Sequence, residues 1–166
     1  MDRAFASIPI SLMILAACGK APDLIIDDME VFYNGHQRLD GQLQIALPII
    51  KKEALAKAKS VGKENELLSQ WNIVIEFKDY PVECGPVKAA GCQDPYNLGT
   101  FYVGWEPKVT NTVLVGEMAH LVWEVCYNKT GENDNWVNNK PVQTLDSDYQ
   151  NWFEMVNQEI KDKLGY

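Results

Sequence analysis

The stretch that decides the fold is TNTVLVGEMAHLVWEVCY, residues 110–127. Thr110 and Asn111 are residue types that cap helices, and the segment behind them is apolar around most of a helical circumference. Its apolar members are Val113, Leu114, Val115, Met118, Ala119, Leu121, Val122, Trp123 and Val125. Because such a helix needs cover on nearly every side, we predict a central helix buried in the middle of a domain, ending near Tyr127.

The segments on either side of this helix predict an α+β domain. The clearest strand is WNIVIEFK, residues 71–78, which places Ile73, Ile75 and Phe77 on one face. The other elements expected are strands at 24–33 and 100–105, a turn at Asn34-Gly35, and helices at 64–70 and 146–164. We therefore predict a small sheet packed on the buried central helix.

One more helix is expected between the first two strands. Helical spacing begins at Asp40, and residues 46–60 hold alanines, lysines and a glutamate at positions that favour a helix. A proline fits the first turn of a helix, where its missing N–H would have no partner. We therefore expect Pro48 in the first turn of this main helix, which Gly62 ends.

Four polar side chains interrupt the apolar surface of the central helix: Glu117, His120, Glu124 and Asn128. At 100° per residue they fall within a stripe about 80° wide. A stripe of this kind is either the edge of the helix that meets water or the wall of a cleft. The pattern alone leaves both interpretations open.

The order of elements around this helix resembles that of the zincin metallopeptidases: helix, strand, small-residue loop (89–91), strand, central helix. In that superfamily the central helix carries His-Glu-x-x-His, in which two imidazoles hold zinc and the glutamate is the general base. The matching segment here is 116–120, Gly-Glu-Met-Ala-His. The resemblance implies a zincin-like fold with Glu117 in the catalytic position and His120 as a metal ligand. Gly116 stands at the first ligand position and offers no side chain to a metal.

The remaining residues do not easily restore a metal site. Catalytic zinc sites keep three protein ligands, and this chain has only one other histidine, His36. A tail seen after this helix in some bacterial zincin-like lipoproteins would place a third histidine where the chain has Trp136. A replacement set would join His120 to carboxylates, namely Glu124 and Asp134, with Glu132 as another choice; such sets suit harder cations than zinc.

We therefore expect no cofactor, with zinc or another divalent metal as the alternative. The expected function is that of a zincin-like domain that has lost catalysis and binds a peptide or a protein partner. Two alternatives stay open. One is a structural envelope protein without a site, and the other is a metal-dependent hydrolase with replacement ligands.

The first eighteen residues predict export. The apolar run 4–17 is too short to span a bilayer and suits a signal peptide. It ends in Leu15-Ala16-Ala17-Cys18, which resembles the lipobox of bacterial lipoproteins, where cleavage precedes the cysteine and lipid is attached to its sulfur. The resemblance implies a signal peptide at 1–17 and a membrane anchor on Cys18. The alternative is a buried N-terminal helix or strand with an incidental cysteine.

The lipobox also predicts the domain layout and the location. A lipidated terminus and linker at 18–23 would precede one globular domain at 24–166. Gly19 replaces the aspartate that retains such proteins in the inner membrane. We therefore expect an envelope protein on the outer membrane, facing the periplasm, if the cell has two membranes.

Composition and the other cysteines agree with an exported globule. The chain of 166 residues is 46% hydrophobic with a net charge of −8, which favours a folded domain and argues against nucleic acid as a partner. Cys84 and Cys92 flank a short, turn-rich loop and predict a disulfide, with a metal site as the alternative. Cys126 lies in the apolar helix and is expected to be a buried free thiol.

Overall fold

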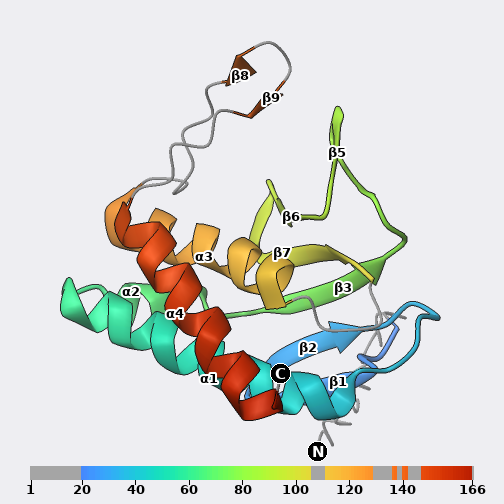
Figure 1. Ribbon diagram of the computed structural model, residues 1–166, viewed down its shortest axis with the longest axis horizontal. Coiled ribbons are helices and arrows are strands. Elements are labelled where there is room, and N and C mark those ends of the chain that lie inside the picture. The colour runs from blue at the N-terminus through green and yellow to red at the C-terminus, as the bar shows by residue number, and fades with distance from the viewer. Residues whose placement is uncertain (1–19, 106–110, 129–135, 138–139, 142–146, 166) are drawn as a thin grey trace, which may run out of the picture.

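The structure is a computed structural model that describes residues 20–105, 111–128, 136–137, 140–141 and 147–165. These residues form an α+β domain with a mixed sheet and a layer of helices (Figure 1). No helix among the described residues has the length and apolar character needed to cross a bilayer. The predicted fold class, a small sheet packed on a buried central helix, is confirmed.

The central sheet has five strands in the order β1-β2-β3-β7-β6. Their bounds are β1 Leu24–Ile26, β2 Met29–Phe32, β3 Val74–Lys78, β6 Gly91–Asp94 and β7 Asn97–Gly104. The three inner strands β2, β3 and β7 run parallel, whereas β1 and β6 pair antiparallel at the two edges. Ile75 of β3 pairs with Val31 on one side and with Phe101 on the other, and all three side chains are fully buried.

The described residues form four helices on the side of the sheet that carries these buried side chains. They are α1 Asp40–Ser60, α2 Glu64–Gln70, α3 Asn111–Tyr127 and α4 Ser147–Leu164. Helices α1 and α3 contact the sheet, and α2 and α4 pack on α1 and α3. The central helix α3 contacts β6 and β7 on one side and α1 and α4 on the other. Leu114, Val115, Met118 and Trp123 of α3 are accordingly buried, as the apolar pattern predicted.

The opposite face of the sheet carries the alternate side chains. Glu76 and Lys78 of β3 form an ion pair there at 2.6 Å, and the Lys78 ammonium lies 5.0 Å from the Tyr102 ring centroid. These side chains are half-buried. The period of two along the strands therefore separates an apolar core face from a polar outer face.

The segment 24–33 was predicted as one strand, and that prediction is wrong. Asp27 and Asp28 adopt positive φ values of 47° and 67° and form the turn of a β1–β2 hairpin. Aspartate is one of the few residues that tolerate this conformation, and two such residues suit the tight turn of a hairpin. The predicted turn at Asn34-Gly35 is confirmed, with φ values of 52° and 93°.

The position of Pro48 was also predicted wrongly. Helix α1 begins at Asp40, so Pro48 lies in its interior instead of its first turn. An interior proline removes one hydrogen bond of the helix. Leu43, Leu47 and Ile50 are fully buried on this helix, and their burial offsets the lost bond.

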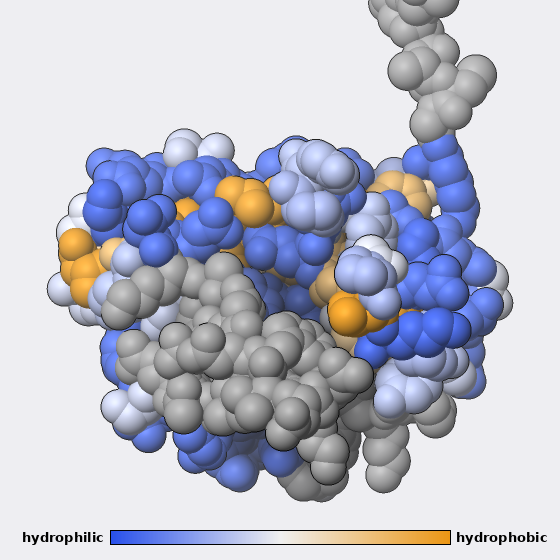
Figure 2. Space-filling model, turned by 90° about the horizontal axis from the view of Figure 1, so that it is seen from above, coloured by the Kyte–Doolittle hydropathy of each residue, from blue (hydrophilic) through white to orange (hydrophobic). Residues whose placement is uncertain are grey.

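Two small hairpins complete the described structure. Strands β4 Val82–Cys84 and β5 Val87–Ala89 pair antiparallel within what the sequence suggested was only a loop. Strands β8 Trp136–Val137 and β9 Lys140–Pro141 form a second two-stranded ladder. Seen from above, the domain is largely hydrophilic, with apolar side chains in separate patches (Figure 2).

Candidate functional site

The candidate site lies on α3, which is held between the edge strand β6 and helix α4. Glu117 is on the side of α3 that faces β6. A Cβ atom placed on Gly91 of β6 would lie 3.0 Å from Glu117 Oε1 and 2.7 Å from Val113 Cγ1. Only a glycine at position 91 allows the helix to approach this closely, and the approach brings the Glu117 carboxyl group against the backbone of the strand.

Gly116 and His120 are on the side of α3 that faces α4. The Tyr149 hydroxyl donates a hydrogen bond of 3.2 Å to the carbonyl oxygen of Gly116. The Tyr149 ring centroid lies 6.1 Å from that of His120, and a Cβ atom on Gly116 would lie 3.6 Å from Phe153 Cε2. Two aromatic side chains of α4 therefore cover the positions that match the two histidines of the zincin motif.

An aromatic cluster fixes α4 in this place. The Trp123 ring lies 5.1 Å from Tyr149 and 5.8 Å from Trp152, measured between centroids. Lys57 of α1 lies with its ammonium 5.1 Å from the Trp123 ring centroid and 2.6 Å from Asp148 Oδ2. The three helices α1, α3 and α4 thus meet at one cation–π and ion-pair contact.

The polar stripe of α3 runs along the boundary between these two contacts. Glu117, His120 and Glu124 are half-buried, whereas Asn128 is exposed and ends the helix at a φ of 53°. Glu117 and His120 both take part in interactions within the chain. The stripe is therefore neither a fully solvated edge nor a sealed interior surface.

The predicted metal ligands are only partly described. His120 and Glu124 lie on α3, but Asp134 and Glu132 lie outside the described residues, as does Cys18. Within residues 20–105, 111–128 and the other described segments, no three His, Cys, Asp or Glu side chains gather closely enough to hold a metal ion. The set His120, Glu124 and Asp134 stays a prediction.

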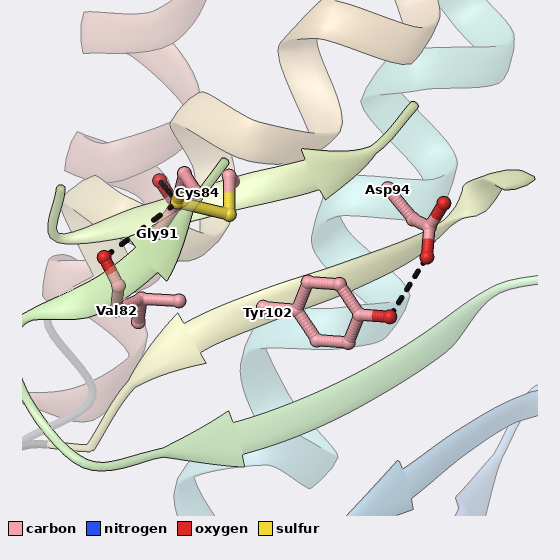
Figure 3. Close-up of a disulfide and its surroundings, with 6 residues drawn as sticks. Val82, Cys84, Gly91, Asp94 and Tyr102 are labelled. Atoms are coloured by element: carbon pink, nitrogen blue, oxygen red, sulfur yellow. Dashed lines mark hydrogen bonds between the residues drawn. A yellow bond between two sulfur atoms is a disulfide. The ribbon is translucent and has the colours of Figure 1, made fainter. Parts of the chain in front are cut away.

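The predicted disulfide is present. Cys84 and Cys92 are joined, with their Cα atoms 6.0 Å apart. The bond fastens the β4–β5 hairpin to β6, and Cys84 Sγ lies 3.5 Å from the carbonyl oxygen of Gly91 (Figure 3). Cys92 pairs with Tyr102 of β7, so the disulfide lies on the outer face of the sheet, opposite to the face that α3 covers.

A second contact holds the β6–β7 turn. The Tyr102 hydroxyl donates a 2.7 Å hydrogen bond to Asp94 Oδ2 (Figure 3). This hydrogen bond is the main cause that lowers the pKa of the Asp94 carboxyl group, and it raises the pKa of Tyr102 to about 12. Both shifts favour the state in which the carboxylate accepts and the phenol donates.

The structure also describes the remaining predicted thiol, Cys126, and the second histidine, His36. Cys126 is a buried free thiol, as predicted, and burial raises its pKa. His36 stacks on Trp105 with ring centroids 5.6 Å apart, and its Nε2 lies 3.6 Å from Asp79 Oδ1.

Sequence reasoning missed the pocket in which His36 lies. It has a volume of about 420 Å³ and is lined by Asn34, Gly35, His36, Phe77, Lys78 and Asp79. It forms where the parallel strands β2 and β3 end, which is a common place for a ligand in sheets of this kind. The sequence shows the turn at Asn34-Gly35 and the histidine that follows it. It does not show that the end of β3, with Lys78 and Asp79, lies beside this turn.

Comparison of the chain with models of known protein families gives no match, and comparison with curated proteins and with solved structures gives none either.

Proposed function

We propose that the mature chain is a lipid-anchored envelope lipoprotein whose zincin-like domain binds a peptide or a protein partner and has lost peptidase catalysis. Cleavage before Cys18 and lipidation of its sulfur would hold the domain at the cell envelope, on the outer membrane facing the periplasm if the cell has two membranes. The partner would bind beside Glu117 and His120.

The observation that carries the loss of catalysis is the packing at Gly116. A Cβ atom at this position would lie 3.6 Å from Phe153 Cε2, in van der Waals contact with that ring. The Tyr149 hydrogen bond holds α4 against the same turn of α3. This face of α3 therefore packs against aromatic side chains of α4, and Gly116 offers no side chain to a metal.

The element order supports the zincin-like part of the proposal. A helix precedes the parallel strand β3, an antiparallel edge strand β6 precedes β7, and α3 follows directly along the chain. Glu117 then lies against the edge strand β6, to which the disulfide fastens the β4–β5 hairpin. A half-buried carboxyl group and an imidazole at the boundary between a strand edge and a helix offer an acceptor and a donor to a peptide.

The metal content of the mature protein tests the catalytic part of the proposal. We expect the protein, extracted in detergent, to contain metal well below one ion per chain and to hydrolyse no peptide. The chain offers a matched pair of variants, His120→Ala and His36→Ala, because it has two histidines. One metal ion per chain, lost in His120→Ala and kept in His36→Ala, would favour the hydrolase alternative instead.

Peptide binding tests the remaining part. We expect the best binder from a peptide library to lose affinity for Glu117→Gln and His120→Ala, and to keep it for His36→Ala. A binder that is indifferent to both α3 variants, or a complete lack of binders, would favour the structural lipoprotein without a site.

A further inference from the structure

The chain is fastened to the domain almost as soon as it leaves the predicted anchor. The Asp23 N–H donates a 2.8 Å hydrogen bond to the Val31 carbonyl oxygen. Its carboxylate accepts a 2.7 Å bond from the Tyr33 N–H, and its own carbonyl oxygen accepts a 2.7 Å bond from Arg38 Nη2. The backbone is therefore fixed against the β1–β2 hairpin from Asp23 onward.

Lys20 also lies on the domain. Its ammonium is 3.4 Å from Asp23 Oδ2 and 6.0 Å from the Phe32 ring centroid. Phe32 is on the outer face of the sheet, which turns away from the helices. Lys20 is two positions after Cys18, a span of at most about 7 Å, and Asp23 is five positions after it, a span of at most about 18 Å.

The surface next to this short connection is partly apolar. Ile25 of β1 is 61% exposed and pairs with Glu30, which places its side chain on the same outer face as Phe32. β1 is the edge strand of the sheet on this side. An exposed isoleucine and a half-buried phenylalanine therefore lie on the outer face of the sheet, to which Lys20 leads the chain from the predicted lipid.

We propose that this anchor-side surface, formed by Lys20, Ile25 and Phe32, lies against the lipid bilayer. The inference rests on the lipidation of Cys18 in the proposed function, because the net charge of −8 disfavours docking without an anchor. With the anchor attached, the surface is held at the bilayer at a high effective concentration, so a small apolar contact suffices.

The orientation places the candidate site away from the membrane. β6 is at the opposite edge of the sheet from β1, four strand spacings or about 19 Å away. Figure 1 shows β1 and β6 at opposite ends of the sheet. Glu117 lies on α3, which packs on the face of the sheet opposite to Ile25 and Phe32, so it would face the periplasm, where a partner has access.

Spin labels on the full lipidated chain test this orientation. The protein is reconstituted in phosphatidylethanolamine–phosphatidylglycerol vesicles, with a label at Ile25→Cys or, as the matched control, at Met155→Cys, both in a Cys126→Ala background. Met155 is 46% exposed on α4, within the helical layer. We expect a several-fold loss of access of an aqueous paramagnetic nickel reagent to the label at 25, and no change at 155. Insertion of ten Gly-Ser residues after Gly19 should restore access at 25.

Two outcomes of the labelling experiment overturn the inference. The mass of the intact protein shows separately whether Cys18 is acylated, which tests the proposed function. An acylated protein whose label at 25 stays as accessible as the label at 155 refutes the orientation while the lipoprotein assignment stands. If the label at position 25 is protected from the nickel reagent in native membranes but not in the vesicles, the surface contacts a membrane protein instead of the lipid. A mass without acyl chains on Cys18 would remove both the proposed function and this inference.

Discussion

Gly91→Ala should be among the more damaging small substitutions in the domain. The added Cβ would lie 2.7 Å from Val113 Cγ1, 3.0 Å from Glu117 Oε1 and 3.0 Å from the Tyr102 carbonyl oxygen. Since one neighbour is backbone and another is a branched core side chain, α3 must move away from β6. Overpacking of this kind costs about 2 kcal/mol, which lowers the melting temperature of a domain of this size by about 4–8 °C.

Gly41→Ala is the matched control for this experiment. Gly41 is within α1, and a Cβ atom there would have no neighbour within 4 Å. We expect this variant to be more stable than the wild type by about 0.5–1 kcal/mol, because alanine favours a helix over glycine. Urea unfolding followed by circular dichroism measures both variants. Equal stability of the two would refute the close contact between α3 and β6.

Three further predictions concern the other contacts. Tyr149→Phe should lower the free energy of unfolding by about 1 kcal/mol in urea titrations, because it removes the hydrogen bond to α3; no loss would mean that the bond does not hold α4. The double variant Cys84→Ser, Cys92→Ser should lower the free energy of unfolding by about 2.5 kcal/mol relative to the oxidised wild type, because the disulfide reduces the entropy of the unfolded chain. A decrease below the experimental error would show that the disulfide constrains the unfolded chain little. The hydrogen bond from the Tyr33 N–H lowers the pKa of Asp23 below 3.8, so the ionised carboxylate stabilises the fold above pH 4 and this stabilisation is lost as the pH falls through the folded-state pKa. The free energy of unfolding of Asp23→Asn should therefore fall less with acid below pH 4 than that of the wild type, and an equal fall in both would contradict this.

The sequence predicted correctly those features whose signal lies within a few consecutive residues. The apolar circumference of α3 and the alternation of Ile73, Ile75 and Phe77 identified the core, and all three of these side chains are buried. The short spacing of Cys84 and Cys92 identified the disulfide. Each of these signals is contained in a few consecutive residues, so no long-range information was required.

The predictions that were wrong or missing depend on distant contacts. Pro48 inside α1 is tolerated because tertiary packing buries Leu47 and Ile50 on the same helix, and the local sequence pattern does not contain this information. Phe153 lies beside Gly116 although the two residues are far apart in the chain, so the local motif could not predict an aromatic ring at that position. The turn at Asp27-Asp28 was missed because two aspartates within an alternating segment also suit a solvent-facing strand.

The mass of the N-terminal peptide of the protein extracted from its native membrane tests the central claim most directly. The account predicts a chain that begins at Cys18 and carries a thioether-linked diacylglyceryl group, and it predicts that Cys18→Ser abolishes this mass while Cys126→Ser leaves it unchanged. A peptide that begins at Met1 with an unmodified Cys18 would contradict the account.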